Sequence, residues 1–256
     1  ELLISNDLLK SENKINHQKY NLVQFNDLVK KADVLLAVGG DGTILSTVRR
    51  LGNMQMPIMG IHIGGLGFLS ECVEENLENS INDLVDGKYG ISKRMLLEVS
   101  FIDGKKKQKS YALNDIVVNH GPSARIVKTE VQVSENYLNT YEGDGLIISS
   151  PTGSTAYSLS AGGPIIYPDL SLITVTPICS HSLSARPIVL RDNETIEFTL
   201  NDEFSLTIDG QISFELNKFI CVKIVKASHD AKLINLFDSS YFDTLRSKMG
   251  WSGNVR

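Results

Sequence analysis

In the first 93 residues, continuous apolar runs alternate with segments whose apolar residues recur at helical spacing. The run from Val34 to Val38 is apolar throughout, which is typical of a strand buried on both faces of a parallel sheet. Pro57 introduces a second apolar run, which reaches Ile63. After the first run, and again before Gly87, apolar residues at helical spacing predict amphipathic helices. These residues are Ile44, Leu45, Val48 and Leu51, and then Leu77, Ile81, Leu84 and Val85. The alternation predicts a Rossmann-like α/β domain with right-handed crossovers.

The start of the chain predicts a helix over residues 22–30, with no strand evident before it. Folds of this class usually place a strand ahead of such a helix. Because the sequence begins at Glu1 rather than Met, we expect that strand to lie in an N-terminal segment that precedes it.

From about Met95 onward, apolar residues recur at every second position, as in half-buried strands. Asp103-Gly104 is a hairpin turn signal. Further strands are predicted at residues 116–118, 127–133, 146–148, 172–176, 196–200, 204–208 and 219–225. Residues 240–249 are helical again in pattern. We therefore predict an α/β domain over residues 1–93, joined by a C-terminal helix at 238–256, and a larger all-β domain, a β-sandwich, over residues 94–237.

Composition narrows the class of protein. A chain of 256 residues makes about one to two domains. The net charge of −5 supplies no basic field for nucleic acid. Cys72, Cys179 and Cys221 lie far apart and form no CxxC pair, which fits a reducing compartment. No apolar run approaches the ~18 residues that a membrane helix needs. We expect a cytoplasmic protein with neither nucleic acid nor membrane as partner.

The glycines gather where apolar runs end, and the first cluster is Gly39-Gly40-Asp41-Gly42-Thr43. Glycines let a phosphate approach the backbone, and the following helix N-terminus favours an anion. The charge of Asp41 would repel a phosphate, so this residue is better explained as a proton acceptor for a hydroxyl or as a ligand to a phosphate-bound metal. A plain glycine turn, with Asp41 capping the helix, is the alternative.

Other nucleotide-binding and catalytic motifs are absent from the sequence. The P-loop pattern GxxxxGK[ST] does not occur. The dinucleotide pattern GxGxxG fails, because Leu45 and Ser70 stand where its third glycine is required. Neither GxSxG nor HExxH is present.

Six segments together resemble the ATP-dependent NAD kinases. GGDGT at residues 39–43 is shared with the wider superfamily of diacylglycerol kinases, sphingosine kinases and phosphofructokinases. The more specific segments are the glycine-rich residues 60–69, Leu113-Asn114-Asp115, the long run from Gly143 to Pro164, residues 176–187 and Asp209-Gly210-Gln211. The resemblance extends from about residue 33 to the C-terminus.

The resemblance implies phosphorylation of the adenosine ribose 2′-hydroxyl of NAD to give NADP. It implies ATP as donor, a divalent cation (Mg²⁺ or Mn²⁺) and a homodimer or homotetramer in which neighbouring subunits complete the dinucleotide site. Asp41 matches the family's general base. The phosphate-contacting loop corresponds to Gly39, Gly40, Gly42 and Thr43. NAD-binding positions correspond to Asp41, Gly42, Phe68, Asn114, Asp115, Asp144, Thr152, Thr155, Ala156, Tyr157, Ser158, Ser160, Cys179 and Gln211.

Three positions depart from the family pattern. His62 stands where Asn is expected, Glu142 where bacterial members often carry Arg, and Ser180 where Pro is usual. Two other functions stay open at this point. One is a lipid or sugar kinase that shares only GGDGT, which would leave residues 143–164 unexplained. The other is a non-catalytic NAD(P)-binding sensor, against which Asp41 and every motif glycine are intact.

Overall fold

A computed structural model describes residues 1–7, 21–63, 67–70, 72–121, 126–236 and 240–251. The chain divides into two compact units. The first comprises residues 1–44, 53–91 and 232–256, and the second comprises residues 45–52 and 92–231. The predicted glycine segment at 60–69 and the predicted C-terminal helical region at 238–256 lie partly outside the described residues. No helix in the described ranges is long and apolar enough to cross a membrane.

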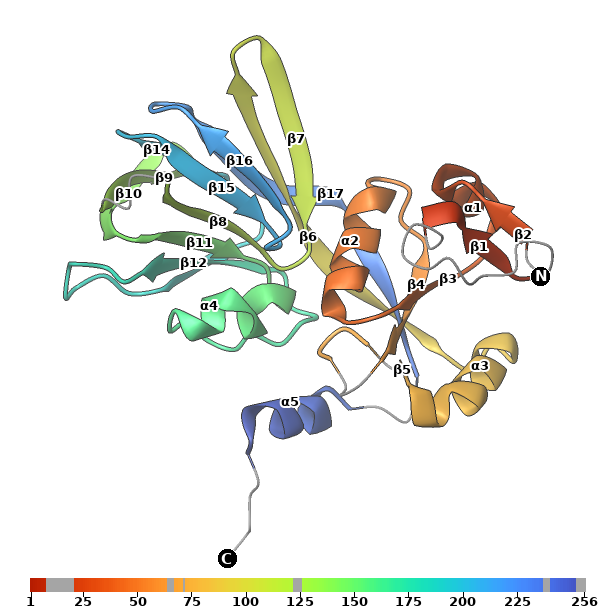
Figure 1. The fold of residues 1–256 in the computed structure, drawn as a ribbon. Helices are drawn as coiled ribbons and strands as arrows, with labels where there is room; N and C mark the ends of the chain where they lie inside the picture. The colour runs from red at the N-terminus through yellow and green to blue at the C-terminus, as the bar shows by residue number, and fades with distance from the viewer. Residues whose placement is uncertain (8–20, 64–66, 71, 122–125, 237–239, 252–256) are drawn as a thin grey trace, which may run out of the picture. The chain divides into compact units, whose positions relative to one another are not determined.

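The first unit has the α/β architecture expected from its alternating periods (Figure 1). Its elements are β1 (Leu3–Ser5), β2 (Asn21–Val23), α1 (Phe25–Lys31), β3 (Leu35–Val38), β4 (Pro57–His62), β5 (Cys72–Val73), η2 (Glu74–Asn76), α3 (Leu77–Val85) and α5 (Tyr241–Met249). Strands β3, β4 and β5 are parallel, and β1 pairs in parallel with β2. Three elements belong partly to each unit: α2 (Asp41–Leu51), β6 (Gly90–Asp103) and β17 (Val222–Asn235).

The apolar positions of α2 were predicted correctly. Ile44, Leu45, Val48 and Leu51 are all buried. Gly60 of β4 lets the helix approach the strand, because a Cβ at that position would lie 2.5 Å from the side chain of Ile44 and 2.9 Å from the backbone of Ser70. A side chain on Gly60 would therefore displace the start of α2 from the sheet.

The prediction that the run Val34–Val38 is buried on both faces is wrong. Burial alternates along β3, and Leu36 and Val38 are 38% and 49% exposed. Among the described strands, β3 is the last in its sheet order, with β4 as its neighbour on one side. The face that carries Leu36 and Val38 is therefore only partly covered by other elements.

The predicted helix over residues 22–30 begins too early, and a strand that was not evident from the sequence pattern directly precedes it. Leu22 and Val23 belong to β2, which pairs with β1 over Leu3–Ser5, and α1 begins only at Phe25. Pairing with a distant segment overrides the helical spacing of these apolar residues.

The second unit is built from two antiparallel sheets. Besides parts of β6 and β17 it contains β7 (Lys106–Ala112), β8 (Asp115–His120), β9 (Val127–Val133), β10 (Asn136–Gly143), β11 (Gly145–Ser149), η3 (Thr152–Thr155), α4 (Tyr157–Ser160), β12 (Leu172–Ile178), β13 (Ile188–Arg191), β14 (Ile196–Leu200), β15 (Phe204–Ile208) and β16 (Ile212–Leu216). One sheet has the order β13-β12-β11-β8-β15-β16. Strands β10, β9, β14 and β17 are consecutive in the other.

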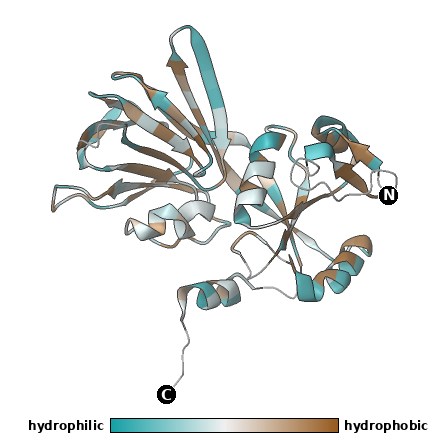
Figure 2. Cartoon of the chain, viewed as in Figure 1, coloured by the Kyte–Doolittle hydropathy of each residue, from teal (hydrophilic) through white to brown (hydrophobic). Residues whose placement is uncertain are grey.

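The core of this unit lies between the two sheets, as the predicted β-sandwich requires. Val131 and Phe198 come from one sheet and Ile116, Leu146 and Phe204 from the other, and all belong to one buried cluster. Hydrophobic residues line these strands, whereas hydrophilic residues gather at the tip of the β6–β7 hairpin (Figure 2). Alternate burial in β14 and β15 follows from the period of two.

Most strands of this unit were predicted, with differences at their ends. The runs at 127–133, 196–200 and 204–208 coincide with β9, β14 and β15. The strand predicted from Phe219 begins instead at Val222, because Phe219 has φ +64° and donates its N–H to Leu200 in a turn. Strands β10, β13 and β16 were not predicted. Polar residues interrupt the apolar pattern of β10, whereas β13 is a short apolar run and β16 alternates with a period of two.

One sheet of the sandwich is covered on its second face as well. All five residues of β11 are buried. Val117, Ile147 and Ile178 form a small cluster on this face, against which Ala161 packs. The segment that carries η3 and α4 therefore lies over the middle of the sheet, and many of the predicted dinucleotide-binding residues belong to it.

Candidate active site

Asp41 is the first residue of α2, directly after the glycines that end β3. Its carboxylate accepts the backbone N–H of Phe68 at 2.9 Å (Oδ2) and that of Leu69 at 3.2 Å (Oδ1). These bonds go to the segment after β4 rather than to the first turn of the helix, so the capping alternative does not describe them. An ionised carboxylate offers about four acceptor positions, so two bonds leave room for a hydroxyl proton.

Two glycines make this geometry possible. A Cβ on Gly67 would collide with the carboxylate of Asp41, and one on Gly39 would collide with the hydroxyl of Thr43. Gly39 also has φ +147°, which favours glycine. Gly42 and Thr43 are exposed at the start of the helix. The turn thus holds a carboxylate beside an accessible helix N-terminus, whose dipole favours anions.

In the second unit, Asn114 and Asp115 lie at the start of β8 and are held by a residue that the sequence analysis did not select. The carboxylate of Asp209 accepts the backbone N–H groups of Leu113 (3.1 Å), Asn114 (2.8 Å) and Asp115 (3.2 Å). In return, the N–H of Asp209 donates to the carbonyl of Asp115 at 2.9 Å. The signal that could have identified Asp209 was its place in the Asp209-Gly210-Gln211 motif.

Asp115 and Asp209 form a buried pair of carboxyl groups, 4% and 7% exposed. Burial, and in smaller part the charge of Asp209, raise the pKa of Asp115 to about 7. Burial also raises the pKa of Asp209, an effect opposed by its three backbone hydrogen bonds and by the charge of Arg49. Asp115 therefore changes its charge close to neutral pH.

The segment from Ser150 to Gly163 is attached by hydrogen bonds to the residues just before β8 and to the sheet. Ser150 donates its N–H to the carbonyl of Asn114 at 2.9 Å, and its hydroxyl donates to the carbonyl of Leu113. A Cβ on Gly153 would collide with the backbone of Asn114. Ser158 of α4 exchanges a hydrogen bond with Thr176 at 3.0 Å.

The predicted dinucleotide-binding residues of this segment differ in exposure. Tyr157 and Ser160 are exposed and Thr155 and Ala156 are half-buried, whereas Thr152 and Ser158 are buried. The buried hydroxyl of Thr152 has no hydrogen-bond partner among the described residues. The structure brings all six together with Asn114 and Asp115 on one face of the sheet.

The remaining predicted residues lie elsewhere in these units. Asp144 is exposed between β10 and β11, and its carboxylate accepts a hydrogen bond from the Cys179 thiol, which raises the pKa of that thiol. Gln211 accepts a bond of 2.7 Å from the guanidinium of Arg49. Phe68 is half-buried, and its backbone N–H donates to the carboxylate of Asp41. The site also involves contacts of Arg49, Gly67 and Ser150, which the sequence analysis did not select.

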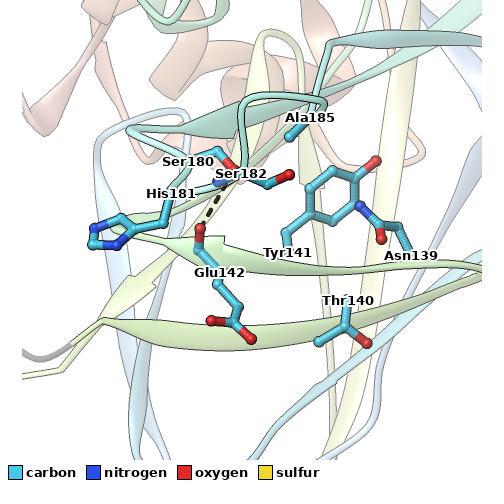
Figure 3. Close-up of a pocket in the computed structure, with 8 residues that line it drawn as sticks. All are labelled: Asn139, Thr140, Tyr141, Glu142, Ser180, His181, Ser182 and Ala185. Atoms are coloured by element: carbon cyan, nitrogen blue, oxygen red, sulfur yellow. Dashed lines mark hydrogen bonds between the residues drawn. The ribbon is translucent and has the colours of Figure 1, made fainter.

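A pocket of about 240 Å³ opens in the second unit between β10 and the chain after β12 (Figure 3). Its lining includes Tyr141, Glu142, Ser180 and His181, and the N–H of His181 donates to the carbonyl of Glu142 at 2.9 Å. Lys128 pairs with the Glu142 carboxylate at 2.7 Å. None of the residues predicted for catalysis or dinucleotide binding lines this pocket.

The comparisons with known proteins match both parts of the chain. A family model described as the ATP-NAD kinase N-terminal domain matches residues 5–89, and one described as the ATP-NAD kinase C-terminal domain matches residues 113–236. An NAD kinase of Geotalea daltonii is 41% identical over 88% of this chain and 81% of its own length. An NAD kinase of Geobacter metallireducens is 43% identical over 86% of this chain and 79% of its own length. The chain belongs to the NAD kinase family.

Solved structures agree with this assignment. A yeast NADH kinase complexed with NADH superposes with a TM-score of 0.88 at 25% identity, and the match covers 100% of this chain and 80% of the other. An NAD kinase from Archaeoglobus fulgidus in complex with ATP shares the fold, with a TM-score of 0.77 at 24% identity and coverage of 98% of both chains. The chain is thus a phosphotransferase that acts on NAD. A lipid or sugar kinase that shares only GGDGT does not account for the match over residues 113–236.

Proposed function

We propose that this NAD kinase transfers the γ-phosphate of ATP to the 2′-hydroxyl of the adenosine ribose of NAD, with Asp41 as general base. The hydroxyl oxygen bonds to phosphorus, the bond from phosphorus to the β–γ bridging oxygen breaks, and ADP leaves. The hydroxyl proton passes to the carboxylate of Asp41. A ribose hydroxyl is a poor nucleophile at neutral pH, so a positioned carboxylate accelerates the attack.

The observation that supports this role is how the Asp41 carboxylate is held by backbone N–H groups. Two backbone N–H groups, from Phe68 and Leu69, hold it in one orientation. A carboxylate held in one orientation is already positioned to accept the proton of a bound hydroxyl. Gly67, which has no side chain, leaves space for this arrangement.

We further propose that Gly39, Gly40, Gly42 and Thr43 bind the phosphates of ATP. Anions are favoured at the N-terminus of a helix, and glycines allow phosphate oxygens to reach the backbone. Among the described residues, no group of three or more His, Cys, Asp or Glu side chains could hold a metal ion. We propose that the expected cation, Mg²⁺ or Mn²⁺, binds with the phosphates of the nucleotide.

We assign dinucleotide binding to Asn114 and Asp115 together with the segment from Thr152 to Ser160. Carboxylate and amide oxygens accept hydrogen bonds from vicinal ribose hydroxyls. The support is that these residues lie on the same covered face of one sheet, fastened to one another by Ser150. Phe68, Asp144, Cys179 and Gln211 complete the proposed set.

Assembly and location complete the proposal. We propose a homo-oligomer, a dimer or tetramer, in which neighbouring subunits complete the dinucleotide site.

We also place the enzyme in the cytoplasm. The support for this location is that its cysteines are free thiols, which suits a reducing compartment.

The decisive experiment replaces Asp41 by Asn, which keeps the size of the side chain and removes its proton-accepting charge. We expect kcat to fall by about 10² to 10⁴, with the Kd for NAD nearly unchanged. The assay couples NADP formation to an NADP-specific dehydrogenase, and calorimetric titration gives the affinity. Asp33→Asn, an exposed aspartate ahead of β3, is the matched control and keeps normal turnover. Normal turnover of Asp41→Asn would exclude the general-base role.

A further inference from the structure

Asp209 lies in the turn between β15 and β16 with a left-handed backbone, φ +49°, followed by Gly210 at φ +63°. This conformation turns its side chain toward the start of β8, about 95 positions earlier in the chain, where one carboxylate accepts three consecutive backbone N–H groups. The Asp209 N–H donates in the opposite direction, to the carbonyl of Asp115. Four hydrogen bonds therefore define the backbone of residues 113–115 relative to this turn.

Burying the charge of Asp209 is energetically unfavourable, and a turn with a purely structural role would not require a charged residue here. Asp209 is 7% exposed, and a buried carboxylate is destabilised unless charges or hydrogen bonds compensate it. Compensation comes from the three N–H groups and from the charge of Arg49, whose guanidinium also donates to Gln211 in the same turn. A neutral residue would close the hairpin without a buried charge. The carboxylate is needed for what it does to residues 113–115.

We propose that Asp209 is a positioning residue for the dinucleotide: its carboxylate holds Asn114 and Asp115 in the orientation that binds the ribose hydroxyls. This inference rests on the proposed role of Asn114 and Asp115. Asp209 is itself buried and acts through these two residues rather than through contact with the substrate. Its loss weakens NAD binding and leaves the ATP site and the phosphoryl transfer step nearly unchanged.

The charge of Asp209 also affects how Asp115 titrates. The charged groups that act on this pair are Asp209 itself and, through Asp209, Arg49 of α2; Ser149, which faces Asp115 from β11, is uncharged. Asp209 adds to the effect of burial on the pKa of Asp115. When Asp209 is neutral, the pKa of Asp115 moves down toward its ordinary value, and Asp115 is charged at lower pH.

The test uses two variants that tolerate the left-handed turn, Asp209→Asn and Asp209→Gly. An amide keeps one acceptor oxygen and presents an N–H₂ group to the N–H of Leu113, whereas glycine has no acceptor. We expect KM and Kd for NAD to rise about tenfold for Asn and by more for Gly. KM for ATP and kcat change less than twofold. The pH at which NAD affinity rises shifts downward in Asp209→Asn. Asp202→Asn, an exposed aspartate in the β14–β15 turn, is the control.

A double-mutant cycle separates positioning from general destabilisation. In the background Asn114→Ala with Asp115→Ala, Asp209→Asn has no residue left to position, so its effect on NAD affinity disappears. Hydrogen exchange in Asp209→Asn is expected to increase at the amides of residues 113–115. A merely structural role would lower the melting temperature and the active fraction, with KM for NAD unchanged.

The outcomes distinguish this inference from the function on which it rests. If Asn114→Ala with Asp115→Ala binds NAD normally, the proposed dinucleotide site is wrong. If that variant loses NAD affinity while both Asp209 variants bind NAD as the wild type does, the site stands and the positioning role of Asp209 is wrong. Additive effects in the cycle would also overturn it.

Discussion

Two aspartates in this protein use backbone N–H groups in the same way for different ends. Asp41 accepts two of them and remains half-buried, so the described residues fill two of its roughly four acceptor positions. Asp209 accepts three and is buried, so its carboxylate is satisfied by groups of the protein rather than by a substrate. The number of bonds and the exposure, rather than the residue type, separate a candidate base from a positioning group.

Asp115 allows a prediction about pH at this scale. Its pKa is about 7 in the folded protein and near its ordinary value of 3.8 when unfolded, so the folded state holds the proton more tightly. The stabilisation is complete below about pH 4 and is lost as the pH rises through about 7. We expect the free energy of unfolding of the wild type to fall by about 1 to 3 kcal/mol more than that of Asp115→Asn between pH 5 and pH 8.

Urea denaturation of both proteins at the two pH values measures this difference. Asp202→Asn should follow the wild type, because that side chain is exposed. If the free energy of unfolding changes equally in Asp115→Asn and the wild type between the two pH values, Asp115 does not titrate in this range.

At the scale of elements, one hydroxyl connects the short 3₁₀ helix η3 to the strands beneath it. Ser150 is fully buried, donates to the carbonyl of Leu113 and accepts the N–H of Gly153 at 3.2 Å. It thereby connects β11, the start of β8 and η3. The segment proposed to bind the dinucleotide contains two elements of only four residues each. Its position therefore depends on such contacts rather than on helix propensity.

Ser150→Ala removes both bonds and leaves a buried carbonyl and a buried N–H without this partner. We expect a loss of about 1 to 3 kcal/mol in the free energy of unfolding and weaker NAD binding. The exposed Ser184→Ala should change stability by less than about 0.5 kcal/mol. Chemical denaturation and calorimetric titration measure the two effects. Unchanged stability in Ser150→Ala would show that η3 is held by other contacts.

At the scale of the whole molecule, the sandwich presents edges and apolar side chains. Strands β13 and β16 end the six-stranded sheet, and Leu183 and Val189 are 93% and 43% exposed. Strand edges are usually paired or covered, and symmetric closure favours even-numbered assemblies. These features support the proposed homo-oligomer.

Light scattering coupled to size exclusion tests the assembly. We expect an active species at twice or four times the chain mass of 28.2 kDa, with specific activity lost on dilution to monomers. An active species of 28.2 kDa would contradict the shared site, as would specific activity that is constant down to the lowest concentration assayed.

Local patterns determined much of this fold and the candidate base. The spacing of Ile44, Leu45, Val48 and Leu51 predicted α2, because a helix that packs on a sheet must bury one face. Period-two runs predicted β9, β14 and β15 for the corresponding reason in strands. The glycines around Asp41 identified the turn that precedes α2, because few other residues tolerate its backbone.

Only the tertiary structure decided which distant segments meet. The pairing of β1 with β2, the exposed face of β3, and the bonds of Asp209 to residues 113–115 depend on neighbours far away in the chain. Periodicity records whether a residue is buried but not what buries it, and a motif records residue types but not the partners of their side chains. The sequence alone therefore determined the class of fold and the family resemblance, whereas the folded chain decided how Asn114 and Asp115 are held, because hydrogen bonds form between atoms that folding brings within about 3 Å.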